Sequence, residues 1–473
     1  MNNYSLLSDF YEYTMANGYH LSDLGNRILY FDLFFRRVPD DGGFVIACGL
    51  QQVIEHIQNL HFDNEDISFL RNKGIFSEKF LVSLVNFRFS GDIWAVPEGT
   101  VVFPGEPLVT VRAKATEAQI IETLLLVCIN HQSLIATKAN RIVRAARGRS
   151  VLEFGARRAH GAESALFGSR AAYIAGCDAT SNTMAEKLFG IPAGGTMAHS
   201  WVQIFDDEYT AFLNYCNIYP QNPSLLVDTF DTLRNGVPNA IRAFLQTGIR
   251  EGSIRIDSGD ITYLSKRIRK ILDEAGLNNI KIIASNSLDE NIIREIIAQG
   301  GMVDIFGVGE RLITAMSDPV LGGVYKLVAV EDSSGNVIPK IKVSENISKI
   351  TTPHFKKVYR LYSKENMKAE ADLICVHNET VDGTKSLEIF DPDFIWKRKM
   401  MSNFIAKELM IPIFKSGELV YNIPEINITR EKCKNEVESL WDEVKRFENP
   451  HNYYVDLSQK LWDEKQRLLL SSR

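Results

Sequence analysis

Residues 150–161 read Ser-Val-Leu-Glu-Phe-Gly-Ala-Arg-Arg-Ala-His-Gly. The apolar run over 151–154 predicts a short strand, and two adjacent arginines, Arg157 and Arg158, follow it directly. The glycines of this stretch would let a ligand approach the backbone closely. In α/β folds the carboxyl ends of strands are the places where chemistry occurs. The stretch therefore predicts a strand that delivers polar side chains to a ligand site.

The same arrangement recurs downstream of this stretch. Further short apolar runs predict strands, and amphipathic helical segments such as 261–275 separate these strands. Strands that alternate with helices favour βαβ units and a parallel sheet. We expect an irregular or incomplete (β/α) barrel within an α/β fold. Strand-like runs follow at 193–198, 224–228, 253–257, 280–285 and 303–308.

Three regions of the chain differ in pattern. Residues 1–148 mix short strands and helices and end in a long buried helix, expected over about 117–147. Residues 149–330 form the barrel-like domain. Residues 331–473 return to short strands followed by polar-faced helices, and we expect this extension to pack back on the N-terminal region as a mixed α/β domain.

Composition excludes several classes of protein. The chain has 473 residues, 45% of them hydrophobic and 24% charged, as in ordinary soluble proteins. A net charge of −6 argues against a nucleic-acid binder. No apolar stretch approaches the ~18 residues that span a bilayer, and the N-terminus does not resemble a signal peptide. Six widely spaced cysteines indicate reduced thiols, so a cytoplasmic protein without a membrane partner is expected.

The ends of the expected strands carry polar residues or glycines. Arginines and glycine amides suit phosphate groups, whereas the aspartates suit either Mg²⁺ with a diphosphate or a cationic sugar transition state. An aspartate after a strand is also often only a helix cap. No GxxxxGK[ST] motif is present, so any use of ATP is not of the P-loop kind. The residues at these ends are Glu153, Arg157, Arg158, Thr196, His199, Asp228, Asp231, Arg255, Asp257, Asp260, Ser285, Asn286, Gly307 and Gly309.

The combination of motifs resembles the nicotinate phosphoribosyltransferase family. The resemblance covers about residues 5–330 and includes the segments 8–15 and 31–37, with a further familial segment at 449–458. Three motifs carry it together: Glu-Phe-Gly-Ala-Arg-Arg (153–158), Gly-Thr-Met-Ala-His-Ser (195–200) and Arg-Ile-Asp-Ser-Gly-Asp (255–260).

The resemblance implies a role for each matching residue. His199 matches a histidine that ATP phosphorylates transiently, and Asp257 is the second catalytic candidate. Positions around the pyridine ring or its substituent match Tyr11, Phe154, Arg157, Asp178 and Thr196. The phosphoribosyl diphosphate and metal region matches Arg255 and Asp257, and the ribose 5-phosphate pocket matches Ser285, Asn286, Gly307 and Gly309. Asp228 joins the substrate-binding candidates through its place at a strand end. Mg²⁺ is expected to bind through the diphosphate, with Asp257 and Asp260 as its candidate protein ligands. Glu310 departs from the family, which often has threonine at this position.

The resemblance also implies an activity and partners. The expected reaction is the ATP-dependent joining of nicotinate to 5-phosphoribosyl 1-diphosphate, which yields nicotinate mononucleotide and diphosphate. Members of the family build active sites from two subunits, so a homodimer with shared sites is expected. Nicotinamide or quinolinate as the base, or a non-catalytic barrel that binds nucleotides, are the alternatives. Quinolinate would call for a larger basic cluster than the sequence shows.

Overall fold

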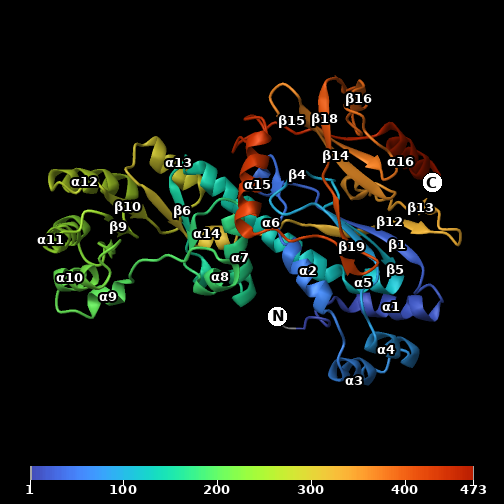
Figure 1. Ribbon diagram of the computed structural model, residues 1–473, viewed down its shortest axis with the longest axis horizontal. Helices are drawn as coiled ribbons and strands as arrows, with labels where there is room; N and C mark the ends of the chain where they lie inside the picture. Colours follow the sequence, from blue (N-terminus) through green and yellow to red (C-terminus); the bar gives the residue numbers. More distant parts are fainter. Residues whose placement is uncertain (1–2, 472–473) are drawn as a thin grey trace. The chain divides into compact units, whose positions relative to one another are not determined.

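The computed structural model describes residues 3–471 and divides into two compact units (Figure 1). Unit 1 combines the chain up to Leu134 with the chain from Val320 onward, and unit 2 is Ile135–Pro319. Residues 331–473 thus lie in the same unit as the N-terminal region. The first boundary falls inside helix α6 (Glu122–Ala145) instead of at 148, and the second falls before Val320 instead of at 330.

Within the described residues, unit 2 contains a six-stranded sheet in the order β7-β6-β11-β10-β9-β8. Every neighbouring pair is parallel, which places all the strand carboxyl ends at one edge. The sheet curls, but its two outer strands, β7 and β8, are not paired with each other, so the barrel is incomplete, as expected. The strands are β6 Ser150–Glu153, β7 Ala179–Thr180, β8 Ser224–Leu226, β9 Gly252–Ile256, β10 Ile280–Ala284 and β11 Ile305–Val308.

The prediction of a strand over residues 193–198 is wrong. This segment is a loop, joined to the sheet through an isolated bridge between Ala193 and Thr180. The sixth strand is instead β7, which comes earlier in the chain. Pro192 cannot donate to a ladder, and Gly194 and Gly195 lose more entropy than other residues when a strand fixes them, which explains the difference.

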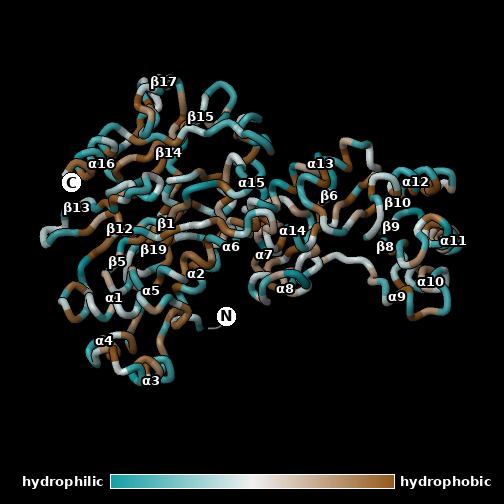
Figure 2. Tube along the Cα trace, turned by 180° about the vertical axis from the view of Figure 1, so that it is seen from behind, coloured by the Kyte–Doolittle hydropathy of each residue, from teal (hydrophilic) through white to brown (hydrophobic). Residues whose placement is uncertain are grey.

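Helices pack against this sheet and form the core of unit 2. Phe212, Phe244 and Leu272 are fully buried with the strand residues Ile254 and Ile256. The outer helices α10, α11 and α12 also carry many hydrophilic residues, as their amphipathic pattern predicted (Figure 2). The helices are α7 Ala162–Ile174, α8 Thr183–Phe189, α9 His199–Gln203, α10 Glu208–Ile218, α11 Val237–Thr247, α12 Ile261–Glu274, α13 Glu290–Ala298 and α14 Glu310–Ile313.

Unit 1 is built from predominantly antiparallel sheets. A seven-stranded sheet has the order β13-β12-β1-β5-β3-β19-β20, and a four-stranded sheet has the order β18-β14-β15-β21. The first contains β1 Ile28–Phe34, β3 Asp92–Ala95, β5 Val109–Lys114, β12 Val324–Glu331, β13 Val337–Pro339, β19 Ile411–Lys415 and β20 Glu418–Leu419. The second contains β14 Lys356–Ser363, β15 Ala369–Val376, β18 Phe404–Glu408 and β21 Val455–Leu457.

Two strand pairs and several helices complete unit 1. The pairs are β2 Val45–Ile46 with β4 Val101–Val102, and β16 Leu387–Phe390 with β17 Arg398–Met401. The helices are α1 Phe10–Leu21, α2 Leu50–Asn59, α3 Asn64–Asn72, α4 Glu78–Val85, α5 Ala115–Ile120, α15 Ile426–Ser439 and α16 Gln459–Ser471.

The long helix expected over 117–147 is present as α5 and α6. Together they cover Ala115–Ala145, which by length and composition alone could cross a membrane. Its sequence is not one continuous apolar stretch, because Glu117 and Glu122 interrupt it. In addition, 72% of its apolar window is buried inside the structure, because the surrounding elements of each unit pack on it. This burial is typical of a core helix.

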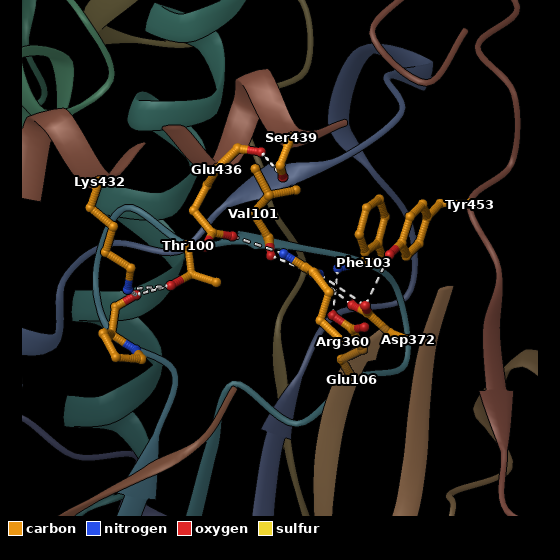
Figure 3. Close-up of polar contacts among 11 residues, drawn as sticks. Thr100, Val101, Phe103, Glu106, Arg360, Asp372, Lys432, Glu436, Ser439 and Tyr453 are labelled. Carbon is orange, nitrogen blue, oxygen red and sulfur yellow. Dashed lines mark hydrogen bonds and ion pairs between the residues drawn. The ribbon is translucent and has the colours of Figure 1, made fainter. Parts of the chain in front are cut away.

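A buried charge cluster joins the two sequence segments of unit 1 (Figure 3). The Arg360 guanidinium is fully buried and pairs with both oxygens of Asp372, through Nε at 2.9 Å and a terminal nitrogen at 2.6 Å. Further bonds of 2.9 and 2.8 Å reach Glu436 and the carbonyl of Val101. One side chain of β14 therefore ties β15, α15 and β4 together.

Glu106 lies beside this cluster and is also buried. Burial, reinforced by the neighbouring carboxylate of Asp372, raises the pKa of Glu106 well above its ordinary value. Burial therefore favours the protonated form of the Glu106 carboxyl group. The direct partners of the Arg360 guanidinium are the side chains of Asp372 and Glu436.

Replacing Arg360 should destabilise unit 1 strongly. Arg360→Met leaves buried carboxylates without a partner, which costs about 3–5 kcal/mol of unfolding free energy. Denaturant unfolding followed by circular dichroism measures the change.

Two variants serve as controls for this prediction. Glu106→Gln should cost less than about 1 kcal/mol, because glutamine resembles the protonated acid that the raised pKa favours. Arg467→Ala, which removes an exposed ion pair on α16, should cost less than about 0.5 kcal/mol. Equal losses for Arg360→Met and Arg467→Ala would contradict the role assigned to the cluster.

Candidate active site

Arg255, near the end of β9, is held by three separate side chains. Its Nε donates to Ser285 Oγ at 2.8 Å, one terminal nitrogen donates to Thr196 Oγ1 at 2.9 Å, and the other lies 2.8 Å from Asp257 Oδ1. Ser285 also donates to Asp257. An arginine has five N–H donors, so these three bonds leave two for a ligand. The strand ends of β9 and β10 and the loop before α9 thus meet at one guanidinium.

Phe154 lies beside Arg255, with its ring centroid 5.8 Å from the guanidinium carbon. The ring packs over Gly307 in β11, where an added Cβ would come within 2.7 Å of two ring carbons. At Gly309 a Cβ would lie 3.0 Å from the Phe154 carbonyl oxygen. The structure therefore gives both glycines a packing function, because they make room for the aromatic residue that follows β6.

Asp228 organises the turn that follows β9. One of its carboxylate oxygens accepts from the amide of Asp257 at 2.9 Å and from the hydroxyl of Ser258 at 2.6 Å. The other oxygen is buried and has no hydrogen-bond partner among the described residues. The sequence did not single out Ser258, although it lies within the 255–260 motif. Asp228 and Asp257 thus lie on adjacent strand ends, with one acceptor of Asp228 unused.

His199 is the first residue of α9 and is half-buried. Its Nδ1 lies 3.1 Å from the hydroxyl oxygen of Thr229, the residue after Asp228. Thr229 is a site residue that the sequence reasoning missed. Its position directly after a polar strand end was the signal that could have found it. The contact fixes the orientation of the imidazole ring.

Arg157 and Arg158 lie on a short 3₁₀ turn after β6 and are exposed. Arg158 pairs with Glu310 at 3.6 Å, which accounts for the carboxylate that departs from the family pattern. Arg157 has no hydrogen bond or ion pair among the described residues, so its guanidinium is available to an anionic ligand. Glu153, by contrast, is buried and hydrogen-bonded to Ser169 and Thr180. Burial raises the pKa of Glu153. This carboxyl group therefore forms structural hydrogen bonds inside unit 2 and does not face a ligand.

Two of the aspartates at strand ends cap helices. Asp231 accepts from the amides of Leu233 and Arg234, and Asp260 accepts from the amide of Tyr263 at the start of α12. The alternative reading of these two residues as caps is thus confirmed. The cap uses one carboxylate oxygen of Asp260, just as the contacts with Arg255 and Ser285 use one oxygen of Asp257.

Asn286 occupies the turn after β10 with a φ of 85°. Asparagine tolerates this left-handed region better than most residues. Its side chain is exposed and accepts from Ser287 at 3.3 Å. Asn286 therefore lies at the same edge of the sheet as Ser285 and Asp257.

Asp178 is the expected site residue of unit 2 that is not brought to this edge, and Tyr11 belongs to unit 1. Asp178 precedes β7 and accepts from Ser150 Oγ at 2.6 Å, so it lies at the amino ends of the parallel strands. Tyr11 is on α1 in unit 1, with its ring exposed. Burial of the Tyr11 hydroxyl and the nearby carboxylate of Glu122 raise the pKa of Tyr11, which keeps the phenol neutral.

The edge combines cationic donors, an oriented imidazole and two carboxylates. Within residues 3–471, no group of three or more histidine, cysteine or acidic side chains could hold a metal by itself. A metal with only one or two protein ligands would need a ligand such as diphosphate to complete its coordination. The arrangement therefore suits a phosphorylated ligand.

Replacing Gly307 should disturb the site through Phe154. Gly307→Ala forces the ring to move, and such overpacking costs about 1–3 kcal/mol of unfolding free energy. Gly18→Ala on α1 is the matched control, since no atom lies within 4 Å of its added Cβ and alanine favours the helix. Thermal unfolding measures both variants. If Gly307→Ala is as stable as Gly18→Ala, the packing explanation fails.

Family models match nearly the whole chain. They describe the N-terminal domain of nicotinate phosphoribosyltransferase over residues 6–130, the nicotinate phosphoribosyltransferase family over 150–360 and the C-terminal domain over 355–465. The three matches follow one another along the sequence. The chain thus contains the successive parts of one family.

Curated relatives agree with these matches. A nicotinate phosphoribosyltransferase of Bacillus subtilis is 44% identical over 463 residues, which cover 98% of this chain and 94% of the relative. One of Mycobacterium tuberculosis is 39% identical over 468 residues, covering 98% and 94%. The crystal structure of human nicotinic acid phosphoribosyltransferase has a TM-score of 0.85 at 27% identity, covering 98% of this chain and all of the human chain. The chain belongs to the nicotinate phosphoribosyltransferase family.

Proposed function

We propose that the chain transfers a phosphoribosyl group from 5-phosphoribosyl 1-diphosphate to nicotinate, as a step of NAD biosynthesis. The products are nicotinate mononucleotide and diphosphate. Family membership supports the reaction. The observation that carries it is Arg255, whose guanidinium is fixed by three side chains and keeps two donors for an oxyanion.

The bond changes fit this arrangement. The nitrogen of the pyridine ring forms a bond to C1 of the ribose, and the bond between C1 and the diphosphate oxygen breaks, so that diphosphate leaves with the electron pair. The sugar becomes oxocarbenium-like in the transition state, which an enzyme accelerates by positioning and electrostatic stabilisation. Arg255 and Arg157 neutralise the anionic groups, while Phe154 offers a flat face to the pyridine ring.

His199 is proposed to couple ATP to this transfer. A neutral imidazole nitrogen attacks the γ-phosphorus of ATP and ADP leaves, so that a phosphohistidine forms; water later releases phosphate. The Thr229 contact holds the ring in one orientation for this attack. The added negative charge then alters how the neighbouring diphosphate site binds substrate and product.

Mg²⁺ is proposed to bind mainly through the diphosphate. Asp257 and the buried, unpartnered oxygen of Asp228 are the protein acceptors that fit this ion. When bound, the ion would neutralise charge on the leaving diphosphate. Asp260 is a further candidate ligand, because its cap on α12 uses one carboxylate oxygen and leaves the other for the ion.

A homodimer in the cytoplasm remains part of the proposal. Tyr11 belongs to a different unit from the other site residues, and 45% of its surface is exposed. A partner subunit could use this ring in the shared site that the family resemblance implies.

The function is tested by turnover combined with labelling. With nicotinate, phosphoribosyl diphosphate, Mg²⁺ and γ-labelled ATP, we expect nicotinate mononucleotide and an acid-labile, base-stable phosphate on the protein. His199→Gln should abolish the label. A preference for nicotinamide over nicotinate would contradict the choice of base, and an unchanged label in His199→Gln would contradict the coupling.

Thr229 provides a graded control for this test. Thr229→Val removes one hydrogen bond, worth about 1 kcal/mol, so phosphorylation should slow about fivefold. Thr229→Ser keeps the hydroxyl and should stay within about twofold of the parent protein. Equal rates for the valine and serine variants would show that the contact does not orient His199.

A further inference from the structure

Unit 1 contains a pocket of about 720 Å³ that none of the proposed site residues line. Its size lies in the range of small-molecule sites, about 300–1,000 Å³. The walls come from segments 38–43, 103–104, 391–397 and 446–456. The last of these includes most of the familial stretch 449–458, for which the proposed reaction gives no role.

The base of the pocket is rigid. The rings of Phe103 and Tyr453 stack at 3.9 Å between centroids with their planes 8° apart. The buried Arg360 guanidinium lies 5.4 Å from the Phe103 ring centroid, and Tyr453 donates to Asp372 at 3.0 Å (Figure 3). The charge cluster therefore fixes two walls of the pocket, so that a ligand would not have to order them.

Asp456 supplies an unused acceptor in this pocket. It lies on β21 and is only 3% exposed, yet its side chain has no hydrogen bond or ion pair among the described residues. Burial and the nearby carboxylate of Asp391, another lining residue, raise the pKa of Asp456 to about 6. The Asp456 carboxylate therefore keeps its acceptor oxygens for a ligand that donates hydrogen bonds.

The pocket is also lined by two cationic side chains, Arg446 and Lys397. Arg446 is exposed and has no hydrogen bond or ion pair among the described residues. Lys397 lies 3.7 Å from Asp391 and 4.2 Å from the ring centroid of Phe394, and its ammonium group keeps donors for an anion. Phe394 and Tyr454 leave 45% and 42% of their surfaces exposed. The pocket thus offers an acceptor for donors, cations for an anion and aromatic surface.

We propose that this pocket binds a ribonucleotide. The ribose hydroxyls donate to Asp456, as they do to acidic residues in other nucleotide sites. The phosphate binds Arg446 and Lys397, and the base packs on Phe394 or Tyr454. A free amino acid would leave most of the volume empty, and no cluster in residues 3–471 has the ligands of a metal site.

The proposal is tested with the full chain and the ribonucleoside monophosphates AMP, GMP, CMP and UMP. Calorimetry should show binding of at least one of them, and hydrogen exchange should slow in 391–397 and 446–457. The 2′-deoxy form of the bound nucleotide should bind at least about tenfold more weakly, because one bond to a carboxylate is lost. Binding of none of the four, or slowing confined to unit 2, would overturn the proposal.

Variants separate the two ends of the ligand. Arg446→Gln lies at the surface and should weaken binding at least about fivefold, with the same loss for the 2′-deoxy form. Asp456→Asn should largely remove the preference for the ribose over the deoxyribose. Arg467→Gln on α16 is the control and should bind like the parent protein. Parent-like binding by Arg446→Gln, or an unchanged ribose preference in Asp456→Asn, would also overturn the proposal.

Discussion

The candidate site depends on how Arg255 is held. A free arginine side chain samples many rotamers, and fixing it costs up to about 2 kcal/mol of side-chain entropy. This entropy is lost already when the protein folds, because the three nitrogens of the guanidinium bind Ser285, Thr196 and Asp257. The charge is therefore oriented before any ligand arrives, which is the condition for strong electrostatic stabilisation.

Parallel pairing explains why these side chains meet. β9 and β10 run side by side in register from Gly252 with Ile280 to Ile256 with Ala284, so their ends lie together. Gly307 of β11 then makes room for the Phe154 ring next to them. In unit 1 a different constraint acts, because the buried Arg360 cluster ties chain segments hundreds of residues apart. Each unit thus has its own polar anchor.

Much of this organisation could be predicted from the sequence. Strand runs that alternate with amphipathic helices indicated the parallel sheet, and the polar residues after the runs placed Arg255, Asp257 and Ser285 at its edge. Local pattern could not show that Asp178 lies at the amino ends of the strands, because this depends on pairing with β6. It also could not distinguish the capping role of Asp260 from metal binding, since both use one carboxylate. The strand expected at 193–198 failed because Pro192 and two glycines outweighed the apolar residues.

The central claim is that the pre-oriented Arg255 guanidinium binds the phosphoribosyl diphosphate. Calorimetric titration of this substrate into Arg255→Lys tests it most directly, because lysine keeps the charge but cannot form the three supporting bonds at once. The account predicts at least a tenfold loss of affinity, about 1.4 kcal/mol, in a variant that retains the secondary structure of the parent protein. Unchanged affinity in that folded variant would contradict it.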